Sequence, residues 1–103
     1  MTKVVIRKKN DLIKDIEIKG HAFSGPYNQD IVCAGISSIV FGTCNALAEL
    51  SNYDEEQIIF KDALIKIPNI SEDKETQLIC QVMIVQLKTI EQSYPQYIEI
   101  AYI

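Results

Sequence analysis

A long apolar segment from Asp30 to about Leu50 does most to restrict how this chain can fold. Strands rarely exceed about ten residues, so a segment of this length predicts a helix. Apolar residues lie nearly all around that helix, which is typical of a helix buried at the centre of a domain. Asn28 or Asp30 can serve as its N-cap. Small or polar residues that would let another helix approach closely form one strip along it: Gly35, Ser38, Gly42 and Asn45.

Shorter patterns on either side predict strands and a second helix. Val4–Ile6 and residues 13–19 predict two strands, and Asn10-Asp11 between them is typical of a hairpin turn. Residues 58–67 predict one or two strands, and residues 97–103 predict a last one. A second helix is expected to follow Ser71 as its cap and to end before Pro95. One apolar face of that helix would carry Leu78, Val82, Val85 and Thr89, and the adjacent face Ile79, Met83, Leu87 and Ile90.

The order of these elements, ββαβ(β)αβ, predicts the α+β class, with a mixed, largely antiparallel sheet and two helices. The chain has 103 residues, of which 48% are hydrophobic and 23% charged. Such a chain is expected to form a single folded domain over residues 1–103. Its mean hydropathy of +0.05 is high for a soluble protein of this size, and we expect dimerisation to cover the surplus apolar surface.

Composition also argues against several functions. The net charge is −4 and no basic patch is present, which disfavours direct nucleic-acid binding and suits a basic protein partner. We expect no apolar run to approach the roughly 18 residues that a membrane span needs. Met1–Asn10 lacks the apolar region of a signal peptide. We therefore expect a cytoplasmic protein with no membrane segment. Three cysteines without a Cys-x-x-Cys pair, beside one histidine, disfavour disulfides and zinc, so no metal or cofactor is expected.

Cys33 lies about three residues into the predicted central helix, 12 positions after the only histidine, His21. Free amide groups and the dipole at a helix N-terminus stabilise a thiolate, and an imidazole within reach would complete the nucleophile of a cysteine hydrolase. The alternative is that Cys33 belongs to the core and His21 is a structural loop residue, because most cysteines are buried. Cys44 and Cys80, which lie mid-helix among apolar residues, fit the core interpretation.

The neighbours of Cys33 allow functional and structural interpretations alike. Asp30 either caps the helix or orients the imidazole. Ser37 follows Cys33 by four positions on the same helix face, so its hydroxyl either points toward the site or fills a tight helix contact. The backbone amides of Cys33 and Ala34 are candidates for stabilising an oxyanion. A loop that could close over the site as a lid is predicted at Ser24, Gly25, Pro26, Tyr27 and Asn28.

Two blocks of this sequence, Gly20-His21-Ala22 and Asp30-Ile31-Val32-Cys33-Ala34-Gly35-Ile36-Ser37, resemble the ribosomal-processing cysteine protease family called Prp. The resemblance covers essentially the whole chain. It implies a cytoplasmic homodimeric endopeptidase that removes the N-terminal extension of a large-subunit ribosomal protein by cutting after an aromatic residue. It also implies that His21 is the general base and Cys33 the nucleophile, with Gly20, Asp30 and Ser37 at supporting positions. Two departures, Asn28 for a usual glycine and Gly35 for a frequent alanine, remove no reacting group.

Two other functions remain open on the sequence. In one, the chain is a non-catalytic dimeric module that binds a basic ribosomal protein or an assembly factor. In the other, Cys33 is a redox sensor. The second is disfavoured because Cys44 lies about 16 Å further along the same helix, too far to act as a resolving thiol.

Overall fold

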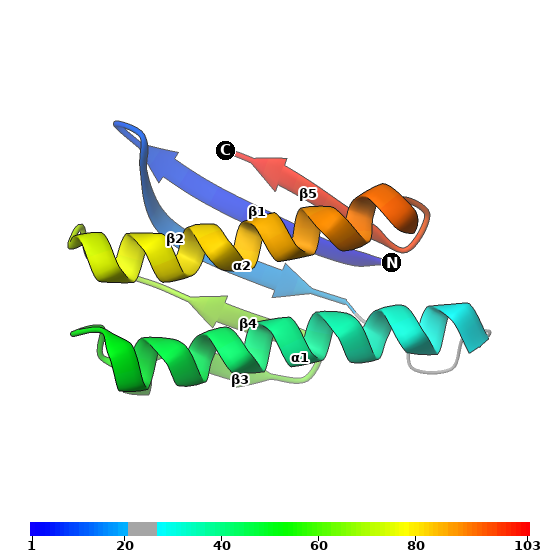
Figure 1. Ribbon diagram of the computed structural model, residues 1–103, viewed down its shortest axis with the longest axis horizontal. Coiled ribbons are helices and arrows are strands. Elements are labelled where there is room, and N and C mark those ends of the chain that lie inside the picture. The colour runs from blue at the N-terminus through cyan, green and yellow to red at the C-terminus, as the bar shows by residue number, and fades with distance from the viewer. Residues whose placement is uncertain (21–26) are drawn as a thin grey trace.

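The computed structural model describes residues 1–20 and 27–103. Two helices lie side by side on one face of a five-stranded sheet (Figure 1). The elements are β1 (Thr2–Lys9), β2 (Leu12–Lys19), α1 (Tyr27–Leu50), the 3-10 helix η1 (Glu55–Gln57), β3 (Ile59–Lys61), β4 (Leu64–Ile67), α2 (Lys74–Ser93) and β5 (Ile98–Tyr102). The strand order is β3-β4-β2-β1-β5, in which β1 and β5 are parallel and the other pairs antiparallel. The predicted α+β class with a mixed, largely antiparallel sheet is confirmed.

The predicted hairpin joins β1 to β2. Its turn residues Asn10 and Asp11 have φ angles of 54° and 64°, the left-handed conformation that two-residue hairpin turns require and that Asn and Asp tolerate well. Apolar side chains from alternate positions of β1 and β2 then face the helices, and Val4, Ile6 and Ile16 are fully buried there. The core therefore lies between the sheet and the helix pair, and the other face of the sheet carries ion pairs such as Lys3–Glu99.

The cap of α2 differs from the prediction. Asp73, not Ser71, is the N-cap, and its carboxylate accepts hydrogen bonds from the backbone N–H of Thr76 at 3.1 Å and from the Thr76 hydroxyl at 2.8 Å. These bonds stabilise the ionised form and lower the pKa of the Asp73 carboxyl. A charged carboxylate is a stronger acceptor than a hydroxyl, which explains why the helix begins two residues later than expected.

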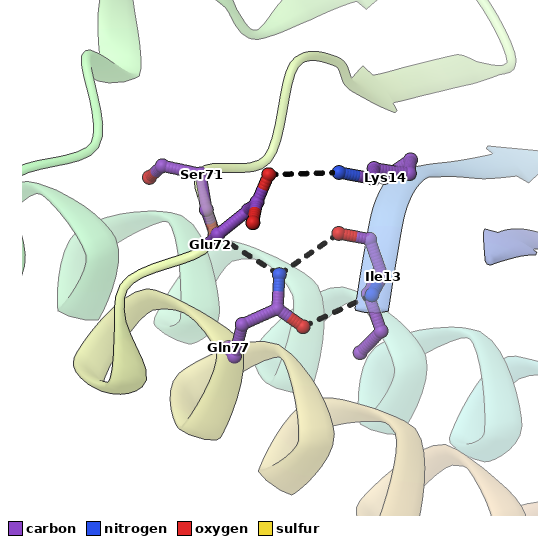
Figure 2. A network of polar contacts seen from close by, with 5 residues as sticks. All are labelled: Ile13, Lys14, Ser71, Glu72 and Gln77. Atoms are coloured by element: carbon purple, nitrogen blue, oxygen red, sulfur yellow. Dashed lines mark hydrogen bonds and ion pairs between the residues drawn. The ribbon is translucent and has the colours of Figure 1, made fainter. Parts of the chain in front are cut away.

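The buried side chain of Gln77 links α2 to Ile13 of β2 (Figure 2). Ile13 lies next to the point where the register of the β1–β2 pair shifts, between Arg7 and Lys8. The Gln77 side chain accepts from the backbone N–H of Ile13 at 3.0 Å and donates to the Ile13 carbonyl at 2.9 Å. It also donates to the Ser71 carbonyl at 2.9 Å. The amide thus provides buried hydrogen-bond partners for both the backbone N–H and the carbonyl of Ile13.

Only one of the two predicted apolar faces of α2 contributes fully to the core. Met83 and Leu87 are completely buried, whereas Leu78, Val82 and Val85 remain about half exposed or more. The small-residue strip of α1 is divided in the same way. Gly35 lies against α2, where an added Cβ would come 3.3 Å from Ile90, but the rest of the strip is exposed: Ser38, Gly42 and Asn45. An uncharged surface is therefore left on the outer side of the helix pair.

The statement that no apolar run approaches membrane-spanning length was wrong. Ile31–Leu50, the larger part of α1, is 20 residues long with a mean hydropathy of 1.8, which meets that criterion by length and composition. It is the one such helix among the described residues. The evidence for a membrane is weak, because the core helix of a soluble protein meets the same criterion. Here Val32, Val40 and Leu47 are buried in the core that the helices share with the sheet.

Candidate active site

Cys33 lies on α1 and lines a cleft between that helix and strands β2, β3 and β4. Its side chain is partly exposed, and the cleft encloses about 270 Å³. Apolar residues from α1, β2 and β4 line most of it, among them Ile36, Ile18 and Ile65. Sites that enclose a drug-sized molecule usually have volumes of roughly 300–1,000 Å³, and this cleft is smaller. A cleft of this size can hold one or a few side chains of a longer ligand, such as a peptide bound along the cleft.

The start of α1 corrects the predicted position of this thiol. The helix begins at Tyr27 rather than at Asp30, so Cys33 is its seventh residue and no longer part of the first turn. Tyr27 and Asn28, predicted as loop residues, belong to the first turn instead. An acidic residue near a helix start is favourable, and residues 27–29 present no helix breaker, so the helix extends to Tyr27.

The earlier start also affects the proposed oxyanion donors. In an α-helix every N–H group beyond the first turn donates to the carbonyl four residues before it. The backbone amides of Cys33 and Ala34 therefore belong to the interior of α1, and the expectation that they are free first-turn donors was wrong. The free first-turn amides of α1 start at Tyr27.

Gly20 occupies a position that requires glycine. Its φ is +77°, and an added Cβ would lie 2.6 Å from the Met1 carbonyl oxygen, a distance that real Cβ atoms do not show. Its backbone N–H donates to the Ala63 carbonyl at 2.9 Å. Gly20 thus joins the end of β2 to the first residues of β1 and to the β3–β4 turn, directly before His21 in the chain.

The remaining predicted site residues have three different outcomes. Ser37 lines the same cleft as Cys33, one helical turn further on, so the structure brings these two and Gly20 to one cleft. Asp30 is the fourth residue of α1, which excludes it as the N-cap. The proposed general base and the remaining loop residues lie outside the described residues: His21, Ser24, Gly25 and Pro26.

Two aromatic residues of the cleft were missed by the sequence reasoning. Phe41 of α1 stacks on Phe60 of β3, with ring centroids 5.9 Å apart and ring planes inclined by 11°. Both rings line the cleft. The signal for Phe41 was available, because positions 33, 37 and 41 follow the i, i+4, i+8 spacing of one helix face. Nothing in the local sequence around Phe60 indicated that its ring would lie beside α1.

The other two cysteines belong to the core, as predicted. Cys44 is 8% exposed and Cys80 fully buried. Burial raises the pKa of the Cys44 thiol and raises that of Cys80 to about 12, since a thiolate loses its hydration there. Because Cys44 and Cys80 are buried, Cys33 is the cysteine that solvent can reach.

Within residues 1–20 and 27–103, no group of three His, Cys, Asp or Glu side chains is arranged to hold a metal ion.

Comparison with known proteins identifies the relatives of this chain. A sequence model of the family described as cysteine protease Prp matches residues 1–99. The ribosomal processing cysteine protease Prp of Staphylococcus aureus strain Mu50 is 40% identical over 96 residues, which are 87% of each chain. That of Bacillus subtilis strain 168 is 36% identical over 102 residues, 91% of this chain and 90% of the relative. The crystal structure of the S. aureus protease with a covalently linked product peptide matches the whole of both chains, with a TM-score of 0.88 and 36% identity.

The chain is an α+β domain with a solvent-accessible thiol in an apolar cleft, and cysteine proteases match it over its whole length. It is therefore a cysteine protease. This class excludes the non-catalytic binding module that the sequence left open. The chain belongs to the Prp family of cysteine proteases, as the two sequence blocks around His21 and Cys33 had indicated.

Proposed function

We propose that this protease removes the N-terminal extension of a large-subunit ribosomal protein, cutting after an aromatic residue. The observation that carries the proposal is the partly exposed thiol of Cys33 in the lining of an apolar cleft, while Cys44 and Cys80 are buried. Further support comes from the relatives, which are named ribosomal processing proteases, and from the product peptide held covalently in the S. aureus structure. A covalent product is what a nucleophilic thiol leaves on the path to hydrolysis.

The chemistry proposed here needs one base and one nucleophile. His21 accepts the proton of the Cys33 thiol, and the resulting thiolate attacks the scissile carbonyl carbon. The tetrahedral intermediate collapses as the His21 imidazolium gives its proton to the leaving amine, and the acyl part remains on sulfur as a thioester. His21 then takes a proton from water, whose oxygen attacks the thioester carbonyl, and the thiol leaves with that proton. Ser37 lies close enough along α1 to offer a hydroxyl at the same cleft.

The test uses a precursor protein that carries the N-terminal extension. Incubation with the wild-type protease should lower the precursor mass by the mass of the extension. Cys33→Ala and His21→Ala should each abolish this change, while Gln92→Ala, at an exposed α2 position outside the cleft lining, should leave the rate unchanged. Cleavage at the normal rate by either of the first two variants would exclude the proposed mechanism.

We further propose that the protease is a homodimer joined through the outer side of its helix pair. No charged residue occurs in Ile31–Ala48 of α1 or in Thr76–Leu87 of α2. These stretches lie beside one another on the same side of the sheet (Figure 1). A shallow cleft runs between exposed Leu78 and Val82 of α2 and the small residues of α1: Ser38, Gly42 and Ala46.

A second copy fits this surface because two uncharged, self-complementary faces can meet about a two-fold axis without repulsion between like charges. Val82→Lys should convert the dimer to a monomer in size-exclusion chromatography with light scattering. Gln96→Lys adds the same charge at an exposed turn outside this surface and should leave the dimer intact. A dimer that survives Val82→Lys would exclude this interface. We place the protein in the cytoplasm, where its three free thiols would stay reduced.

A further inference from the structure

The stacked pair Phe41–Phe60 is a large, partly solvent-exposed apolar surface in the cleft that Cys33 also lines. The two side chains are 48% and 54% exposed although they stack on each other. Phe60 pairs across the strands with Ile65, which also lines the cleft, so both project from the sheet toward α1. Two half-exposed aromatic rings that form part of the same cleft as a nucleophile are typical of a surface that binds a ligand.

The spacing along α1 places this pair at a defined distance from the thiol. Cys33, Ser37 and Phe41 follow one another at four-residue intervals on one face of the helix, and all three line the cleft. Eight residues of helix span about 12 Å at 1.5 Å per residue. An extended peptide advances about 3.3 Å per residue, so about three to four residues separate the attacked carbonyl from the phenyl rings.

We propose that Phe41 and Phe60 form a selectivity site for an apolar side chain on the third or fourth residue before the scissile bond. The proposal rests on the protease function above. The residues before the scissile bond are the ones that stay on the thiol as a thioester while water attacks, so they need a contact that persists through both steps. Among residues 1–20 and 27–103, the charged ones that line the cleft are Lys61 and Asp62, whose charges cancel. Such a lining offers nothing to the basic, RNA-binding part of a ribosomal protein.

The experiment compares peptides that differ only at the third or the fourth residue before the scissile bond, with leucine or serine there. Wild type should cleave the leucine peptide with a kcat/KM about tenfold higher than the serine peptide at one of these positions. Phe60→Ala should remove this preference by slowing only the leucine peptide, and Phe60→Leu should retain most of it. Leu50→Ala, which removes an exposed apolar side chain outside the cleft lining and outside the proposed dimer surface, should leave the preference unchanged.

A binding measurement separates this proposal from the proposed function. Fluorescence anisotropy with the inactive Cys33→Ala protein should show the same preference in Kd, and Phe60→Ala on that background should remove it. If the wild type binds both peptides and cleaves neither, the proposed protease function is excluded. The ratio of the two Kd values then still tests whether Phe60 selects the apolar side chain. Equal effects of Phe60→Ala on both peptides, or a preference that it leaves intact, would overturn the proposal. A Phe60-dependent preference for residues after the scissile bond would overturn it as well.

Discussion

The backbone N–H of Gly20 donates to the carbonyl oxygen of Ala63 at 2.9 Å, which joins the end of β2 to the β3–β4 turn beside the cleft. Residue 20 is also the last described residue before His21. The conformation of Gly20 therefore depends on contacts with two other parts of the chain, the β3–β4 turn and Met1. Its left-handed φ and the nearby Met1 carbonyl leave no room for any other residue.

The first prediction concerns Gly20. Gly20→Ala should lower the free energy of unfolding by about 1–3 kcal/mol, because the added Cβ meets both a strained φ and the Met1 carbonyl. Chemical denaturation measures this change. Lys19→Ala, the preceding exposed strand residue, should change stability by less than about 0.5 kcal/mol. Equal stability of the two variants would contradict the described approach of Gly20 to Met1.

The second prediction concerns thiol reactivity. Iodoacetamide at neutral pH should modify Cys33 first, because its side chain reaches solvent whereas Cys44 and Cys80 are buried. Burial also raises the pKa of both core thiols, so the reactive thiolate is scarce there at pH 7–9. Peptide mapping by mass spectrometry should locate one label in the folded protein and three after denaturation. Modification of all three thiols at similar rates in the folded protein would be incompatible with this packing.

The third prediction concerns Gln77. Gln77→Leu should destabilise the fold by about 2–4 kcal/mol, since it leaves the backbone N–H and carbonyl of Ile13 buried without their partner. Thermal unfolding followed by circular dichroism gives the measurement. Gln81→Leu places the same substitution on an exposed position of α2 and should cost far less. Comparable losses in the two variants would show that the Gln77 bonds contribute little.

The fourth prediction concerns pH. The hydrogen bonds from Thr76 hold the pKa of the folded Asp73 carboxyl below its value in the unfolded chain. The stabilisation is therefore present above the unfolded pKa, about 3.9, and is lost as the pH falls through the lower folded pKa. Asp73→Ala should have a lower Tm than wild type at pH 7, and the difference should shrink below about pH 4. A difference that stays constant over this range would argue against a charged cap.

Much of the fold was predictable because its signals are local. Alternation in residues 13–19, the Asn10-Asp11 turn and the length of the apolar segment each act within a few neighbouring residues, and they led to the hairpin, the two helices and the α+β class. The helix starts were predicted less well. Several residues before each helix can act as a cap, and the choice between Ser71 and Asp73 depended on which acceptor met Thr76.

The site was predictable in part for the same reason. The spacing that puts Cys33 and Ser37 on one helix face is local, and so is the resemblance of the two sequence blocks to the Prp family, which the comparisons confirmed. The role of His21 remains a prediction, because that residue lies outside the described part of the chain. Phe60 could not be foreseen, since its place in the cleft depends on how β3 pairs with β4 and on where α1 crosses that edge of the sheet.

The amino-acid sequence alone determined the element types, the class of fold and the family, because hydrophobic period, turn chemistry and short motifs are properties of neighbouring residues. Only the tertiary structure decided where α1 begins, which face of α2 stays uncovered and which rings line the cleft. These features arise from contacts between segments that are far apart in the chain. Such contacts depend on how the helices pack on the sheet, and local sequence patterns do not predict them.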